Sequence, residues 1–149
     1  MRKFLNFGKI ASYSKSGIKK DSCNKYSFAT IFDKVISKEI PAEIVFEDKD
    51  ILAFKDVNPQ YPVHILLIPK KLDGLSHLSK AEGRHQEILG KLMLATKKVA
   101  EIAKIDKKGY RVVINNGDDG GQTVEHIHLH LVGGCPIGWP PGRPRQFKV

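Results

Sequence analysis

The stretch His126-Ile127-His128-Leu129-His130-Leu131-Val132 alternates histidine with apolar residues. A period of two is that of a β-strand, so the three histidines are predicted to face one side and the apolar residues between them the other. The apolar side packs onto a core. The other side places three imidazoles in a row, each about 7 Å from the next. A surface strand has little use for such a row, and the pattern therefore indicates chemistry.

A fourth histidine, His64, lies in the strand-like run 63–68. If this run pairs with the histidine stretch, four imidazoles share one pocket. Taken alone, His64 is more often a core histidine with satisfied hydrogen bonds. The last two histidines, His77 and His85, stand in polar surroundings in the sequence and are assigned no role.

Imidazoles on one face can carry out nucleophilic chemistry at phosphorus, because a neutral ring nitrogen attacks and a protonated one donates. His128 is central and is the predicted nucleophile, with His130 holding the phosphate and His126 and His64 orienting their neighbours. The alternative is a zinc site of three histidines and a water. The two cysteines, Cys23 and Cys135, form no CxxC pair, so we expect neither a metal nor another cofactor.

A glycine-rich loop precedes the histidine stretch and ends in Gly120-Gly121-Gln122-Thr123. Consecutive glycines let backbone N–H groups converge on an anion, and Gln122 and Thr123 add side-chain donors. The alternative is a plain hairpin turn. Asn115 closes the strand before the loop. Asp56 ends another strand and is placed to accept both ribose hydroxyls, unless it only terminates that strand.

The remaining pattern predicts one α+β domain with a mostly antiparallel sheet. The domain opens near Ser27, and a first helix follows with a capping box at Thr30 and Asp33. Pro41 stops that helix. A second capping box, Ser79 and Glu82, opens the longest helix, which runs to about Ala103. Its predicted buried stripe is Ile88, Leu89, Leu92, Met93, Thr96, Val99 and Ala103. Strands are predicted at 43–47, 51–56, 63–68, 110–115 and 126–132.

The charge of the chain is concentrated at its beginning. The 149 residues carry a net charge of +9, but residues 1–30 hold seven Lys or Arg against the single acid Asp21. The rest is nearly balanced, which argues against a nucleic-acid binder. No apolar run has the length of a membrane span. Residues 1–26 favour an organelle transit peptide, most simply mitochondrial, over an uncleaved tail on a cytoplasmic and nuclear protein.

The motif His-φ-His-φ-His-φ-φ, with φ apolar, resembles that of the histidine triad (HIT) superfamily, and residues 126–132 match it throughout. The resemblance runs from about Thr30 to Gly142. Within the superfamily the chain is similar to the HINT branch, the histidine triad nucleotide-binding proteins. The stretches that carry this similarity are Ile31-Phe32 with Lys38-Glu39-Ile40-Pro41-Ala42, Ile68-Pro69-Lys70-Lys71, Asp119-Gly120-Gly121-Gln122-Thr123 and Trp139-Pro140-Pro141-Gly142.

The resemblance implies a homodimer in which two five-stranded sheets join into one of ten strands. It implies hydrolysis of purine nucleoside phosphoramidates, with an AMP or GMP moiety, through a nucleotidyl-histidine intermediate. By position, His128 is the nucleophile, His130 holds the phosphate, and His126, His64 and Thr123 complete the catalytic group. Nucleotide binding falls to Ile31, Phe32, Phe54, Asp56, Val57, Asn115, Gly121, Gln122 and Thr123, together with His128 and His130.

Two departures from the family pattern matter. Ile51 stands where some relatives have cysteine, so the zinc seen elsewhere in the superfamily is not expected. The domain should span residues 27–142, and residues 143–149 extend beyond the usual family end, which bears on leaving-group preference. The competing functions are a diadenosine polyphosphate hydrolase of the Fhit type and a non-catalytic nucleotide-binding regulator. The Trp-Pro-Pro-Gly segment argues against the first.

Overall fold

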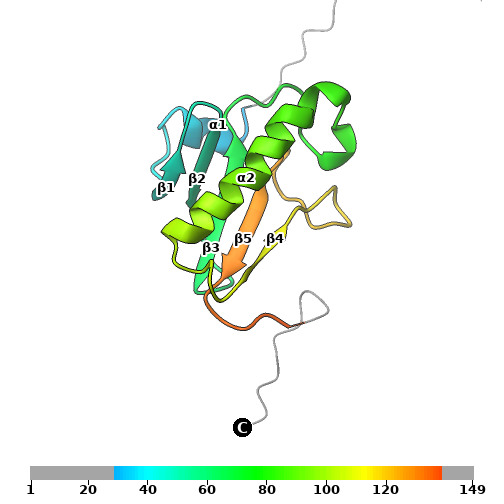
Figure 1. Ribbon diagram of the computed structural model, residues 1–149. Helices are drawn as coiled ribbons and strands as arrows, with labels where there is room; N and C mark the ends of the chain where they lie inside the picture. Colours follow the sequence, from blue (N-terminus) through cyan, green and yellow to red (C-terminus); the bar gives the residue numbers. More distant parts are fainter. Residues whose placement is uncertain (1–28, 139–149) are drawn as a thin grey trace, which may run out of the picture.

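The computed structural model describes residues 29–138 and contains an antiparallel sheet between two helices (Figure 1). The sheet has the strand order β1-β2-β3-β5-β4. This confirms the predicted α+β class with five strands. No helix in residues 29–138 is long and apolar enough to cross a membrane. The elements are α1 (Ile31–Ile36), β1 (Ile44–Glu47), β2 (Ile51–Lys55), β3 (Val63–Pro69), α2 (Gln86–Ile102), β4 (Tyr110–Val113) and β5 (Leu129–Gly133), with short 3-10 helices η1 (Leu78–Lys80) and η2 (Gly83–His85).

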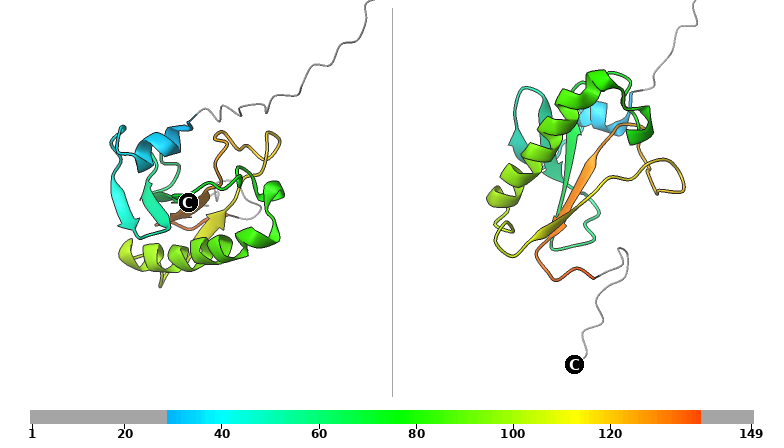
Figure 2. Two further views of the ribbon diagram at one scale, coloured as in Figure 1. Left: turned by 90° about the horizontal axis from the view of Figure 1, so that it is seen from above. Right: turned by 45° about the vertical axis from the view of Figure 1, so that its right-hand side comes forward.

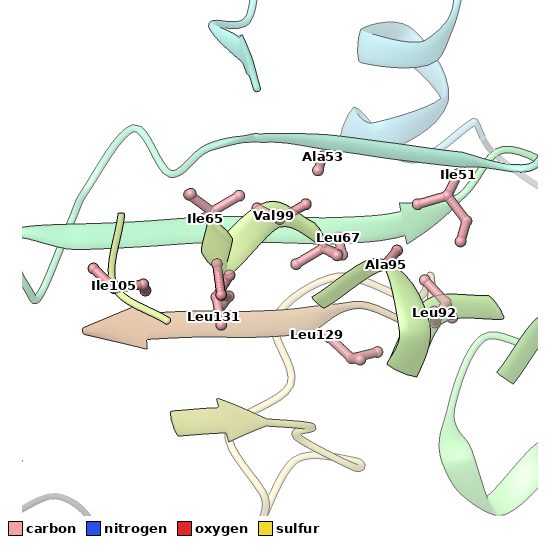
Figure 3. Close-up of a cluster of buried hydrophobic side chains, with 11 residues drawn as sticks. Ile51, Ala53, Ile65, Leu67, Leu92, Ala95, Val99, Ile105, Leu129 and Leu131 are labelled. Carbon is pink, nitrogen blue, oxygen red and sulfur yellow. The ribbon is translucent and has the colours of Figure 1, made fainter. Parts of the chain in front are cut away.

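Pleat parity divides the sheet into two faces. The helix α2 covers one face, and α1 lies on the opposite side (Figure 2). On the α2 face the buried cluster is entirely apolar (Figure 3), with Ile51, Ala53, Ile65, Leu67, Leu129 and Leu131 from the sheet and Leu92, Ala95, Val99 and Ala100 from α2. The alternate strand positions Leu52, Phe54, Leu66 and Ile68 pack on the α1 face against Phe32 and Val35.

The first helix keeps its predicted start but ends earlier than expected. The Thr30 hydroxyl accepts the Asp33 N–H at 3.2 Å, while the Asp33 carboxylate accepts the Thr30 N–H at 2.6 Å, so the capping box is confirmed. The helix ends at Ile36, before Pro41 can act as its stop. Lys38 adopts a left-handed conformation with φ 63°, which turns the chain away from the helix axis.

The long helix begins later than the sequence indicated. Its first residue is Gln86, and the capping box that precedes it joins Glu82 to His85 rather than Ser79 to Glu82. Because that box closes a 3-10 turn, the α-helical pattern starts only afterwards. The expected stripe is also wrong at one position, since Met93 is 51% exposed. Ala95 and Ala100 occupy buried positions instead.

The histidine stretch is only partly a strand. The β3–β5 ladder ends at the pair Leu67–Leu129, so β5 begins at Leu129 and both His126 and His128 precede it. The physical cause lies opposite, where Pro69 has no N–H to offer. Its carbonyl accepts the His126 side chain at 2.8 Å, and the Ile127 N–H turns to the carbonyl of Leu75 at 3.2 Å.

Candidate active site

A cavity of about 240 Å³ lies between α1, the end of β2 and the segment that carries the histidines. Of the predicted site residues, eight line it: Ile31, Phe32, Phe54, Asp56, Val57, Thr123, His128 and His130. The sequence missed six further lining residues, namely Val35, Ile40, Pro41, Ala42, Leu66 and Val124. Two of these had a readable signal, because Val35 follows Phe32 by one helical turn and Leu66 shares the parity of His64.

His128 is held as a neutral ring with one nitrogen free for chemistry. Its Nδ1–H donates to the carbonyl of His126 at 2.7 Å, which leaves Nε2 as the unprotonated atom. The residue is 4% exposed, and burial lowers the pKa of its imidazole, while the His126 carbonyl and Asp56 oppose that shift. A buried, neutral imidazole with a free Nε2 is the state that a nucleophile requires.

His126 supports that arrangement from behind. Its Nε2–H donates to the Pro69 carbonyl at 2.8 Å, and its ring does not line the cavity. Burial is the main cause of its lowered pKa, with Pro69 and then Asp33 acting in the opposite direction and His128 adding to the lowering. His126 is therefore neutral near pH 7, and it acts on His128 through its backbone carbonyl.

The tautomer of His130 is set by a chain of hydrogen bonds that begins in the loop between β2 and β3. The backbone N–H of Gln60 donates to Nδ1 of His64 at 3.1 Å, so in the neutral ring the proton of His64 is on Nε2. That nitrogen lies 2.9 Å from Nδ1 of His130 and donates to it. His130 must then carry its own proton on Nε2, a buried atom with no hydrogen-bond partner among the described residues. The Nε2–H of His130 is thus a donor that can bind an acceptor on a ligand.

The pKa of His130 lies well below its ordinary value. Burial is the largest cause of its fall to about 4, with His128 and His64 adding to it and Asp56 opposing it. The rings of His128 and His130 lie 5.0 Å apart, centre to centre. A lone pair on the first ring and an N–H on the second are thus neighbours at the cavity wall.

The part of the cavity wall next to the histidines is apolar and partly open. The rings of Phe32 and Phe54 meet edge to face at 5.8 Å, and Ile31 and Val57 are exposed beside them. Asp56 marks the polar end, where Oδ1 accepts the Asn58 N–H at 2.8 Å and Oδ2 lies 3.4 Å from Nε2 of His64. An apolar slot that ends in a carboxylate has the shape and chemistry for a nucleoside.

The glycine-rich loop is folded on itself. Gly121 and Gln122 donate their backbone N–H groups to Asp118 and Gly117 carbonyls within the loop, at 2.8 and 3.0 Å. The side chain of Gln122 donates to the carbonyls of Ser76 and Val124, at 2.7 and 2.9 Å. A Cβ at Gly120 would collide with the backbone of Asn116, so glycine is required there.

Three of the predicted ligands therefore support the loop in this structure. They are Gly121, Gln122 and Asn115, whose amide donates to the Gly121 carbonyl at 3.4 Å. Thr123 is the loop residue that reaches the cavity.

Two other histidines complete the picture. His85, predicted to be solvated, is 1% exposed, because its Nδ1 accepts the Glu82 N–H and its Nε2–H donates to the Asp73 carbonyl. His77 contacts the Ser76 hydroxyl and does not line the cavity. Neither residue belongs to the site.

In the part of the chain that the structure describes, one cluster of side chains could hold a cation. Atoms of Asp56, His64 and His130 all lie within 4.8 Å of one another. The two histidine nitrogens in this cluster already share one hydrogen bond, so a metal would have to displace that proton. That no metal is needed remains a prediction.

Comparisons with known proteins agree with this geometry. The HIT domain family matches residues 37–136. The chain is 59% identical to the adenylylsulfatase HINT1 of Arabidopsis thaliana over 113 residues, 76% of each chain, and 58% identical to a 14 kDa zinc-binding protein of Zea mays, over 76% of this chain and 88% of that one. A HIT family hydrolase structure from Legionella pneumophila Philadelphia 1 superposes with a TM-score of 0.72 at 46% identity, over 75% of this chain and 98% of that one.

The structure has a row of histidines at the end of its sheet, and one family model matches two thirds of the chain. Together these findings identify the protein family. The chain belongs to the HIT family. Within that family its relatives place it in the HINT branch of nucleotide-binding hydrolases.

Proposed function

We propose that the protein hydrolyses purine nucleoside phosphoramidates, releasing AMP or GMP, through a nucleotidyl intermediate on His128. The observation that carries the proposal is the pair of complementary tautomers at the cavity wall. His128 presents the lone pair of Nε2, and His130 presents an N–H that has no other partner among the described residues. An attacking nitrogen beside an anion donor is suited to phosphorus chemistry.

In the proposed reaction the base packs between Phe32 and Ile31, and Asp56 accepts the ribose hydroxyls. The Nε2 lone pair of His128 forms a bond to phosphorus while the bond to the leaving amine breaks. His130 donates to a phosphate oxygen throughout, and Thr123 adds a hydroxyl. Water then cleaves the phosphorus–Nε2 bond. The leaving amine takes a proton from solvent as it departs, and the attacking water later gives its hydroxyl to phosphorus and a proton back to solvent, so that one water is consumed over the cycle.

The direct test is to trap the intermediate. We expect rapid-quench intact-mass analysis with an adenosine phosphoramidate to show one adenylyl group, absent in the His128→Asn variant, which should still bind AMP. Parallel assays with a diadenosine polyphosphate separate the Fhit-type alternative. Faster turnover of the latter would refute the phosphoramidate assignment. Nucleotide binding without turnover of either substrate would support the regulator.

A second candidate leaving group is sulfate, because the Arabidopsis relative is called an adenylylsulfatase. The same attack by His128 on an adenylyl sulfate would expel sulfate, which needs no proton at neutral pH. Measuring kcat/KM for both substrates with one enzyme preparation decides which leaving group is preferred. Residues 143–149, which were expected to bear on leaving-group preference, lie outside the described residues.

We further propose that two copies join their sheets into one of ten strands. β4 is an edge strand of the sheet, with no strand paired to its outer side among the described residues. An open edge strand favours pairing with a second copy. Analytical ultracentrifugation should give twice the 16.7 kDa chain mass, and a purely monomeric protein at micromolar concentration would refute the dimer.

The predicted transit peptide and the C-terminal extension fall outside the described residues. From the charge of residues 1–26 alone, we propose delivery to an organelle, most simply the mitochondrion. Mass spectrometry of the protein from its native cells should find a shortened N-terminus. An intact Met1 on cytosolic protein would refute this proposal.

A further inference from the structure

The Nδ1 atom of His126 is buried and has no hydrogen-bond partner among the described residues. Because its Nε2–H is donated to Pro69, Nδ1 of the neutral ring holds a lone pair. This lone pair lies 3.9 Å from Oδ1 of Asp33, which is also an acceptor. Two facing acceptors without a proton between them repel each other, and the buried nitrogen gains no compensating bond. The resting site therefore contains an unfavourable contact.

The Asp33 carboxylate is held in that position by the first turn of α1. Its Oδ2 accepts both the N–H and the hydroxyl of Thr30, at 2.6 and 2.8 Å, which leaves Oδ1 directed toward His126. The capping box thus fixes a negative charge beside the histidine row. Asp33 does not line the cavity, so direct contact with the nucleotide is not its role.

The space around the two catalytic-site rings excludes water. The Phe32 ring lies edge-on to His126 at 5.8 Å and to His128 at 5.1 Å, and the two histidines are 0% and 4% exposed. In such a region a charge acts over longer distances than in water. Because the Asp33 side chain itself is 38% exposed, solvent screens part of its field.

We propose that Asp33 is a positioning residue that acts through His126 to stabilise the positive charge created when His128 takes up the nucleotidyl group. This inference rests on the proposed function. When Nε2 bonds to phosphorus, the leaving group departs with the electron pair of its own bond. The His128 ring keeps its Nδ1–H on the His126 carbonyl and becomes cationic.

The carboxylate then faces a histidine pair that carries a net positive charge, and repulsion gives way to attraction. An interaction that is unfavourable at rest and favourable in the charged state lowers the barrier to reaching that state. The groups that face His126 are Asp33 on α1, the Pro69 carbonyl on β3 and the neighbouring His128. Asp33 is the one anion among them.

Matched variants separate charge from capping. Asp33→Asn removes the charge but keeps an oxygen that can accept from Thr30, whereas Thr30→Ala weakens the cap and keeps the charge. We expect Asp33→Asn to lower kcat about tenfold with KM and Tm unchanged. Thr30→Ala should lower Tm by a few degrees and leave kcat within about twofold, because the backbone N–H of residue 30 still holds the Asp33 carboxylate. A kcat equal to that of wild type in Asp33→Asn, or a higher KM with normal kcat, would overturn the proposal.

A second readout does not depend on turnover. Titration of His126 by NMR should show a lower pKa in Asp33→Asn than in wild type, because Asp33 raises it. An unchanged pKa would show that Asp33 does not act on His126. If the wild type fails to cleave phosphoramidates, the proposed function falls, while this titration still decides whether the contact exists.

Discussion

The two faces of the sheet bury different kinds of side chain, one for packing and the other for binding. On the α2 face, the strand residues of the cluster are all aliphatic and at most 5% exposed. On the opposite face, His64 and His130 lie on the same side of the strands as apolar residues such as Leu66 and Ile68. Within residues 29–138, the buried side-chain nitrogens that lack a hydrogen-bond partner are those of His126 and His130. The α2 face thus consists of packed apolar side chains, whereas the opposite face keeps ring nitrogens that can still form hydrogen bonds with a ligand.

The sharpest test of this division is His128→Ala. We expect turnover of an adenosine phosphoramidate to fall by at least about four orders of magnitude, because no second nucleophile replaces Nε2. The Tm should stay close to that of wild type, as measured by thermal denaturation followed by circular dichroism. His128→Asn serves as the control for AMP binding by calorimetry. Near-normal turnover in His128→Ala would remove the covalent mechanism.

The apolar face should respond in the opposite way. Leu67 is 0% exposed, and Leu67→Ala should cost about 2–5 kcal/mol of unfolding free energy in urea, because it opens a cavity. The folded fraction should keep its KM. Leu94→Ala is the matched control on α2, since Leu94 is 73% exposed and should change stability by less than about 0.5 kcal/mol. Equal losses in the two variants would contradict the assignment of the core.

A smaller effect is expected at the base of the histidine relay. His64→Phe keeps a buried ring but removes the donor to His130 Nδ1, and kcat should fall about tenfold to a hundredfold. Gln60→Ala is the control, because Gln60 contributes its backbone N–H and should leave kcat unchanged. A normal rate for His64→Phe would show that the tautomer of His130 needs no support.

Acidification should lower the free energy of unfolding through the histidines of the site. The unfolded chain protonates this position near the ordinary pKa of 6.5, whereas folded His130 stays neutral until about pH 4. Between these values the unfolded state binds more protons, so stability present above pH 6.5 is lost as pH falls toward 4. From this group alone the folding equilibrium should change about tenfold per pH unit. Urea unfolding of wild type and His130→Asn at pH 7 and 5 measures the difference, and equal pH slopes would contradict it.

The smallest expected effect is that of metal removal. Exhaustive dialysis against EDTA should leave kcat unchanged, because the N–H of His130 and the hydroxyl of Thr123 can stabilise phosphate charge without a cation. Added zinc should inhibit, since it would compete for the nitrogens of His64 and His130. Loss of activity with EDTA, restored by stoichiometric zinc, would establish a metal enzyme instead.

The sequence predicted the pocket well where side-chain parity determines position. His64 and His130 fall on one face of paired strands, and their contact at 2.9 Å follows from strand parity and the observed register. Phe54 lies on the same face of β2, next to Leu66 of β3. Long-range placement of these residues needed only alternation and pairing.

The prediction failed where backbone hydrogen bonds replaced regular structure. Nothing in the pattern showed that β5 would begin only at Leu129, because the cause is a missing N–H on Pro69 in another strand. His85 looked exposed because its two partners are main-chain groups, which have no sequence signature. Asp33 was identified as a cap, but its distance to His126 depends on how α1 docks.

The protonation pattern of the pocket is written in the main chain. The tautomers of His126, His128 and, through His64, His130 trace back to two carbonyls and one amide, at Pro69, His126 and Gln60. Every amino acid keeps its carbonyl, and every one except proline keeps its N–H. The residue at position 60 can therefore change in evolution or in a saturation library without loss of this hydrogen bond. Proline is the exception, because it would remove the N–H that donates to His64. The backbone of such a residue is thus essential to the site, while its side chain is free to vary.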